Sequence, residues 1–286
     1  MTGRDCWASW VLRARRPGDP ELETLAGELF RTVRGRVLDR AALTEGETLL
    51  DVGCGDGLIA FGAVERGAGL VIFSDISQDL LDESRRLADE LGVTDRCRFL
   101  RAPADDLHEL VDESVDVVTT RSVLIYVDDK ESAFREFHRV LRPGGRVSLF
   151  EPINRISRFL DGYDAQDVQE LDDRVKRVFR ELQPRETDPM LNFDDRDLVE
   201  LAERAGFERV HLILEVETSP PDPAPWDAVA DMPPNPRVPS LREAMEQVLT
   251  ADERERYEAH MRPLVEGGLG SRRMASAYLL AVKKSG

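Results

Sequence analysis

The 286-residue chain lacks any long hydrophobic run. No apolar stretch approaches the roughly 20 residues that a membrane-spanning helix needs, so we expect no association with a membrane. The N-terminal region contains several arginines, but no continuous apolar stretch with a small-residue cleavage site follows them. We therefore expect no secretory signal and a cytoplasmic location.

Cysteine is scarce as well. Cys6, Cys54 and Cys97 are odd in number and widely spaced, which suits neither a disulfide framework nor a thiolate zinc site. We expect three free thiols. No cluster of His, Cys and carboxylate residues has the spacing of metal ligands, so no metal is expected.

The chain is also short of basic charge. Its 39 Lys and Arg residues face 56 Asp and Glu residues, which gives a formal net charge of −17 at pH 7. This excess would repel a phosphate backbone, because affinity for nucleic acid depends largely on Lys and Arg. The composition therefore argues against a nucleic-acid partner, although it leaves room for a local basic patch.

The hydrophobic pattern predicts an α/β fold. Residues 21–38 carry apolar side chains at spacings of three and four, which is typical of a helix. From Thr48 onward, short apolar runs alternate with amphipathic stretches, and this alternation indicates βαβ units and a parallel sheet. The clearest helix is Lys130–Leu141, with Asp128 or Asp129 as its cap. Seven strands are expected: Thr48–Val52, Leu70–Ser74, Cys97–Arg101, Val115–Thr119, Arg146–Glu151, Arg209–Glu217 and Met274–Lys283.

Two segments do not belong to this alternation. Residues 152–194 are charged and predicted to be helical. Residues 218–273 open with eight prolines and continue as helix, with a capping box at Thr250–Glu253. A structureless loop of that length would be unusual, so we interpret the second segment as a cap or lid, with a packed decoration as the alternative. The predicted organisation begins with an N-terminal helical segment (1–42) and a core (43–151). A helical insertion (152–194) and a core continuation (195–217) follow, and the chain ends with the cap (218–273) and a final strand (274–286).

A glycine-rich turn is the strongest functional signal. The apolar strand that begins at Thr48 runs into Gly53, Gly55 and Gly57, where the missing Cβ atoms let the backbone approach a ligand. A dinucleotide fingerprint would need its third glycine at Leu58, so a nicotinamide oxidoreductase is disfavoured. About twenty residues later, Asp75 ends the second strand, where a carboxylate can accept hydrogen bonds from both hydroxyls of a ribose. A ribose without a pyrophosphate fits S-adenosylmethionine (SAM).

Together, these motifs resemble those of the class I SAM-dependent methyltransferases. The resemblance covers roughly Leu43–Glu151 and the last two strands, and it includes the turn Arg142–Gly145 before the fifth strand. It implies a Rossmann-like, doubly wound, seven-stranded sheet with an antiparallel last strand, N-terminal helices and a cap formed by insertions. It also implies that SAM is the cofactor and S-adenosylhomocysteine the product.

The same resemblance assigns the cofactor-binding residues. In this family an Asp usually follows the third strand near the adenine, whereas this chain has Pro103 there, so either Asp105 replaces it or the contact is lost. The predicted cofactor-binding residues are Asp51, Gly53, Cys54, Gly55, Gly57, Asp75, Ile76, Ala104, Asp105, Arg121 and Ser122.

Candidates for catalysis and acceptor binding follow the fourth and fifth strands. Tyr126 lies where many relatives have a histidine, and it either orients an acceptor or packs in the core. Glu151 ends the fifth strand and Asn154 follows it, at the sheet edge where open α/β folds bind ligands. We predict Tyr126 and Glu151 as catalytic residues, and Tyr126, Glu151 and Asn154 as acceptor-binding residues. Trp7, Trp10 and Tyr163 either line the acceptor pocket or pack in the interior.

The sequence thus predicts transfer of a methyl group from SAM to an oxygen, nitrogen or carbon atom of a small molecule. Two alternatives stay open: a protein or RNA methyltransferase, and a protein that binds SAM without turnover. A homodimer is compatible with the sequence.

Overall fold

A computed structural model describes residues 3–15, 20–158 and 162–286 of the chain. The chain forms two compact units. The first comprises Met1–Pro152, Asp195–Leu214 and Ser276–Gly286, and the second comprises Ile153–Asp194 and Glu215–Ala275. The two segments that stand outside the βαβ alternation in the sequence therefore fold together as one unit.

The first unit is built on a seven-stranded sheet with the strand order β3-β2-β1-β4-β5-β7-β6. Strands β1 to β5 are parallel to their neighbours, and β7 is antiparallel to β5. The predicted Rossmann-like sheet with an antiparallel last strand is confirmed. The strands are β1 (Thr48–Val52), β2 (Leu70–Asp75), β3 (Cys97–Arg101), β4 (Val115–Arg121), β5 (Leu141–Pro152), β6 (Arg209–Ser219) and β7 (Arg272–Val282).

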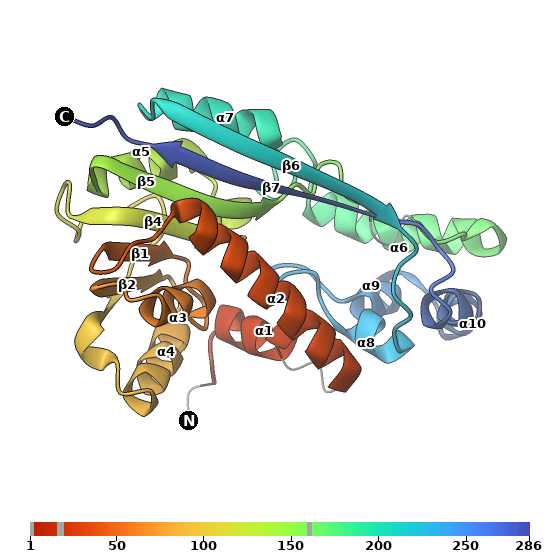
Figure 1. Cartoon of the computed structure of the whole chain (residues 1–286). Helices are drawn as coiled ribbons and strands as arrows, with labels where there is room; N and C mark the ends of the chain where they lie inside the picture. Colours follow the sequence, from red (N-terminus) through yellow and green to blue (C-terminus); the bar gives the residue numbers. More distant parts are fainter. Residues whose placement is uncertain (1–2, 16–19, 159–161) are drawn as a thin grey trace. The chain divides into compact units, whose positions relative to one another are not determined.

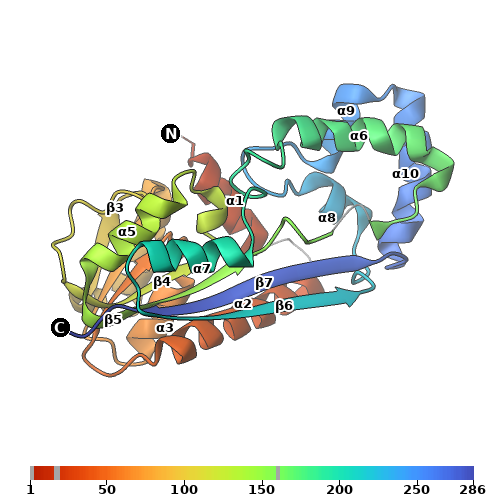
Figure 2. The same cartoon turned by 90° about the horizontal axis from the view of Figure 1, so that it is seen from above.

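Helices cover both faces of this sheet (Figures 1 and 2). On one face, α2 (Pro20–Ala41), α3 (Leu58–Glu65) and α4 (Gln78–Glu90) share a hydrophobic core with β1 and β2. On the other face lie α5 (Lys130–Val140) and α7 (Asp195–Arg204), which contact each other. Burial on both faces explains why the central strands read as continuous apolar runs.

The parallel strands all end at the same edge of the sheet. Along this edge, the strand order reverses between β1 and β4. Open α/β sheets bind ligands outside the carboxyl ends of their strands at such a point. Helix α1 (Cys6–Arg15) contacts α2 and α4, and its side chains reach the turns at this edge. The fold thus places the glycine turn, the residues after β2 and those after β4 next to one another.

The second unit is helical and has its own core. It contains α6 (Gln169–Leu182), α8 (Trp226–Asp231), α9 (Leu241–Val248) and α10 (Ala251–Glu266). Fully buried side chains from all four helices meet in this core, among them Val175, Trp226, Met245 and Tyr257. The predicted capping box at Thr250 is confirmed, and Ser240 forms a second one at the start of α9. No helix within the described ranges is long and apolar enough to cross a membrane.

Candidate cofactor site

The glycine turn joins β1 to α3 in the first unit. Gly53, Gly55 and Gly57 have φ angles of 63°, 56° and 84°, in the left-handed region that favours glycine. A Cβ atom on Gly53 would overlap Val123, and one on Gly57 would lie 2.5 Å from the ring of Phe61. A Cβ on Gly55 would meet only Val11 of α1, at 3.9 Å. Packing therefore requires two of the three glycines, whereas the third faces more open space.

Asp75, at the end of β2, is bonded directly to this turn. Its Oδ2 accepts a hydrogen bond from the amide of Gly55 at 2.8 Å, and its Oδ1 accepts one from the amide of Ser77 at 2.9 Å. Burial raises the pKa of Asp75 above its usual range, in spite of these bonds. Since each carboxylate oxygen can accept two hydrogen bonds, both oxygens retain capacity for a ligand's hydroxyl groups. The two strongest sequence signals thus form one structural feature.

Asp51, in β1 just before this turn, binds the elements on either side of it. Its carboxylate is 2% exposed, and it accepts hydrogen bonds from the Thr119 hydroxyl at 2.8 Å and the Ala60 amide at 3.1 Å. Burial raises the pKa of Asp51 to about 7. Through these two bonds Asp51 ties the start of α3 to β4, and its predicted contact with the cofactor stays a prediction. The neighbouring Cys54 is also buried, and its amide binds the Ser74 carbonyl.

Glu151 plays a similar part for the turn after β4. The side chain is fully buried, and its carboxylate accepts hydrogen bonds from the amides of Val123, Leu124 and Ile125 at 2.9, 3.0 and 3.3 Å. Burial raises the pKa of Glu151 to about 7, although these amides act in the opposite direction. The sequence predicted a catalytic, acceptor-binding group here. In the structure the turn folds back onto the carboxylate, and the predicted contact of Glu151 with an acceptor stays a prediction.

The turn that Glu151 holds carries three of the predicted residues. Ser122 adopts a φ of 56°, which is rare for a residue other than glycine. The guanidinium of Arg121 lies 5.3 Å from the ring centroid of Phe30. The ring of Tyr126 makes an edge contact with Trp7 of α1, with centroids 4.8 Å apart. Tyr126 thus lies at the carboxyl edge of the sheet beside α1, and its role toward an acceptor stays a prediction.

Three further predicted residues follow β2 and β3. Ile76 is 44% exposed, which is high for a large apolar side chain beside the buried Asp75. Ala104 is buried, and Asp105 is partly buried. Asp106 instead pairs with His108 at 2.8 Å on the surface. Asp105 therefore stays the better candidate for the adenine contact.

Asn154 belongs to the second unit, where its carbonyl accepts a hydrogen bond from the Ser157 amide. Its proposed contact with an acceptor stays a prediction. Tyr163 also lies in this unit, in an isolated β-bridge with Gly270.

Sequence reasoning missed Asp5, which lies just before α1. Its Oδ2 accepts a hydrogen bond from the Ser77 hydroxyl at 2.6 Å, and its Oδ1 accepts one from the Ala8 amide at 2.9 Å. The second bond is that of an N-cap, for which Asp is a preferred residue, and this pattern could have been found. The bond to Ser77 spans 72 residues and has no local sequence signal.

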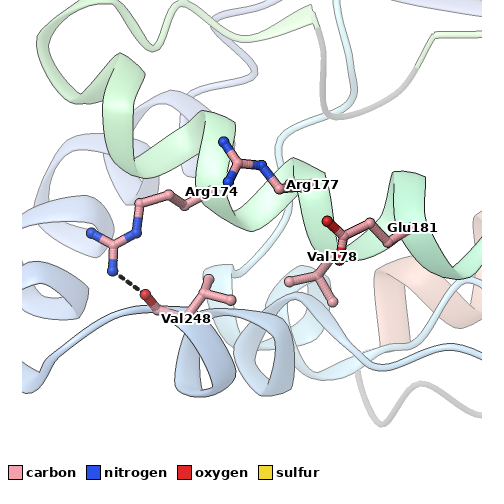
Figure 3. A pocket seen from close by; sticks show the side chains of 5 residues that line it. All are labelled: Arg174, Arg177, Val178, Glu181 and Val248. Atoms are coloured by element: carbon pink, nitrogen blue, oxygen red, sulfur yellow. Dashed lines mark hydrogen bonds between the residues drawn. The ribbon is translucent and has the colours of Figure 1, made fainter.

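The second unit has a surface pocket of its own, which Figure 3 shows. It is lined by Arg174, Arg177, Val178 and Glu181 of α6 and by Val248 of α9. The Arg174 guanidinium donates hydrogen bonds to the Glu253 carboxylate, at 2.7 Å, and to the Val248 carbonyl. We assign no ligand to this pocket. Among the described residues, no group of three or more His, Cys, Asp and Glu side chains is placed to hold a metal ion.

Comparison with known proteins agrees with this geometry. Residues 50–149 match a family model described as a methyltransferase domain. The chain is 33% identical over 129 residues to the tRNA 5-carboxymethoxyuridine methyltransferase of Escherichia coli K12, covering 44% of this chain and 49% of that protein. The chain therefore spans about half the length of this relative.

A second relative is matched over more of its length. The chain is 25% identical over 192 residues to a ubiquinone/menaquinone biosynthesis C-methyltransferase of Vibrio parahaemolyticus, covering 65% of this chain and 74% of that protein. The fold is similar to that of phosphoethanolamine N-methyltransferase 2 of Haemonchus contortus in complex with SAM. That likeness has a TM-score of 0.52 at 18% identity, and it covers 88% of this chain and 52% of the other.

Proposed function

We propose that the chain is a class I SAM-dependent methyltransferase that transfers the methyl group of SAM to a small-molecule acceptor, and the match of residues 50–149 to a methyltransferase domain supports this. SAM is the methyl donor of this family. The observation that carries the proposal is the 2.8 Å hydrogen bond between the Gly55 amide and the Asp75 carboxylate. This bond joins the glycine turn after β1 to the acidic residue that ends β2, next to the point between β1 and β4 where the strand order reverses.

The residues present at this edge fit such a cofactor. Asp75 would accept hydrogen bonds from the ribose hydroxyls, and the exposed apolar side chain of Ile76 would lie against the adenine. Gly55 leaves the space that a close ligand needs, because a Cβ there would meet only Val11. Asp51 and Glu151 act indirectly, since they hold the two turns that form the site.

When bound, SAM supplies a methyl group on a positively charged sulfur. Transfer of this group is an in-line displacement, so the chain's main tasks are to align the acceptor and to exclude water. The turn after β4 is suited to alignment, because the carboxylate of Glu151 fixes the backbone from Val123 to Ile125. Tyr126 follows at once, and its hydroxyl is a group that can orient an acceptor or exchange a proton with it.

The net charge of −17 favours a small acceptor over a nucleic acid. The likeness to a tRNA methyltransferase supports RNA methylation as a second candidate, although it covers 44% of the chain. These two functions differ in what they require of the surface. An RNA acceptor needs a basic face for the phosphates, whereas a small molecule needs an enclosed pocket.

The proposal is tested by measuring formation of S-adenosylhomocysteine. Purified protein is incubated with SAM and either a set of quinones, amines and phenols or bulk tRNA. We expect turnover with a small molecule and none with tRNA. Turnover with tRNA alone would favour the second candidate. Binding of SAM without turnover on any acceptor would favour a non-catalytic SAM-binding protein.

A further inference from the structure

Helix α1 and Asp5, the residue just before it, contact all three turns that border the cofactor site in the first unit. Asp5 binds Ser77 after β2, Trp7 contacts Tyr126 after β4, and Val11 lies 3.9 Å from the position of a Cβ atom on Gly55 after β1. A helix that only covered the hydrophobic core would not need polar contacts at this edge. The contacts of α1 therefore raise the question of what Asp5 does for the site.

Asp5 is linked to the ribose-binding carboxylate by a continuous set of hydrogen bonds. The Ser77 hydroxyl donates to Asp5 Oδ2 at 2.6 Å, and the Ser77 amide donates to Asp75 Oδ1 at 2.9 Å. The Ser77 hydroxyl also accepts from the amide of Leu80 at 3.1 Å, which caps α4. Ser77 is 2% exposed, so water does not compete effectively for these bonds.

The hydrogen bond between the Ser77 hydroxyl and the Asp5 carboxylate is charge-assisted. A hydroxyl that donates to a carboxylate makes a charge-assisted hydrogen bond, which is shorter and stronger than one between neutral groups. The Asp5 amide also donates to Asp79 Oδ2 at 2.6 Å. The start of α1 is thus fixed to the start of α4 through both the backbone and the side chain of one residue.

We propose that Asp5 is a positioning residue of the cofactor site, which fixes Asp75 through Ser77 and holds α1 beside Gly55. This inference rests on the proposed use of SAM. Asp5 touches neither ribose nor methyl group in this proposal. Because the ribose is common to SAM and S-adenosylhomocysteine, the loss of Asp5 must weaken binding of both ligands to the same degree.

A purely structural role would predict a different result for one informative variant. Asn is as good an N-cap as Asp, so Asp5→Asn preserves the bond to the Ala8 amide. The Asn side chain has one oxygen, and its amide nitrogen would replace the oxygen that accepts from Ser77. Asp5→Asn therefore retains the helix cap and replaces the charge-assisted bond from Ser77 by a weaker, neutral one, in which the Asn amide can only donate to the Ser77 hydroxyl.

The experiment measures binding of SAM and of S-adenosylhomocysteine by calorimetry, together with the thermal midpoint. We expect Asp5→Asn to weaken both ligands by about tenfold with little change in the thermal midpoint. The matched control is Asp82→Asn, the same change on the exposed surface of α4, where Asp82 binds Gln78 and Arg85. The control should bind both ligands as the wild type does.

A double-mutant cycle gives a second test that does not depend on the stability of one variant. If Asp5 acts through Ser77, then Asp5→Ala should weaken SAM binding about tenfold in the wild type and much less in a Ser77→Ala background. Equal effects in both backgrounds would overturn the inference, as would an Asp5→Asn variant that binds both ligands normally. A wild-type protein that binds neither ligand would contradict the proposed function itself, and the two failures are thereby distinguishable.

Discussion

The two units of the molecule use their buried acidic groups in opposite ways. In the first unit, the buried carboxylates of Asp51, Asp75 and Glu151 accept hydrogen bonds from backbone amides that lie 2 to 28 residues away in sequence. In the second unit, the buried carboxylate of Asp172 binds two side chains, the Tyr257 hydroxyl at 2.9 Å and the Lys176 ammonium at 2.6 Å. Buried carboxylates thus fix the backbone beside the ends of the strands in the first unit, whereas in the second Asp172 links helices α6 and α10. The difference teaches that the first unit uses its buried carboxylates to pre-organise backbone, which is what a binding site needs.

The largest expected effect concerns Gly55, the glycine of the turn after β1 that has the most space around it. We expect Gly55→Val to weaken SAM binding by at least about a hundredfold, because the branched side chain would fill the ligand's space and strain a backbone with φ of 56°. Gly53→Ala is the comparison, since its Cβ would overlap Val123 and should therefore lower the stability instead.

Calorimetry with SAM and a urea titration separate the two outcomes. A folded Gly55→Val protein with wild-type affinity would mean that the turn is structural and binds no ligand.

The next effect concerns the core of the second unit. Trp226 is fully buried, and removal of its ring in Trp226→Ala should cost about 3–5 kcal/mol of stability. Since the proposed cofactor residues lie in the first unit, we expect SAM affinity at low temperature to change by less than about threefold. Loss of SAM binding in a variant that remains folded would break the division of roles between the units.

The matched control is Trp226→Phe. The Nε1 atom of Trp226 is buried and has no hydrogen-bond partner in the part of the chain that the structure describes. Phe keeps most of the ring and removes this unpaired donor, so the expected change in stability is small. A large loss would indicate that the indole nitrogen has a partner after all.

A further effect is a change in the pH dependence of stability. Burial raises the pKa of Glu151 to about 7 in the folded chain, above the value of about 4.3 expected in the unfolded chain. Between these values the folded state retains a proton that the unfolded state has lost. Stability therefore falls as the pH rises through this window, by at most about 1.4 kcal/mol per pH unit, and levels off above pH 7.

Urea titrations from pH 5 to pH 8 test this expectation. Gln cannot titrate, so the stability of the wild type relative to Glu151→Gln should decrease as the pH rises from 5 to 7. A difference that stays constant over this range would contradict the raised pKa of Glu151.

Much of the fold followed from the sequence for simple physical reasons. All seven strands were predicted, and the parallel ones stand out because buried parallel strands give apolar runs, which Gly or Asp then end. Strand β6 was predicted too, although it is largely exposed. The start of α5 was also predicted, because Asp129 is a good cap and does accept a hydrogen bond from the Ser132 amide. The end of this helix was placed one residue too late, since Leu141 already pairs with β4.

The candidate site was predicted in part. Gly55 and Asp75 were identified separately, but nothing in their local sequence indicates that they are hydrogen-bonded to each other. The sequence indicated that Glu151 ends a strand at the ligand-binding edge. It could not show that the turn after β4 folds back to bind the carboxylate. The union of residues 153–194 and 215–275 in one unit likewise depends on contacts between segments far apart in the chain.

The measurement that tests the central claim most directly is the titration of SAM into the wild type and into Asp75→Ala, with Asp106→Ala as the control. Asp106 is exposed and pairs with His108, so its loss should leave SAM binding unchanged. Asp75→Ala removes a carboxylate whose proposed charge-assisted bonds to the ribose would each be worth about 1.5–3 kcal/mol. We expect the wild type to bind SAM, and the affinity to fall more than tenfold, or by more than about 1.4 kcal/mol, in Asp75→Ala. Equal affinity in a folded Asp75→Ala protein, or no binding to the wild type, would contradict this expectation.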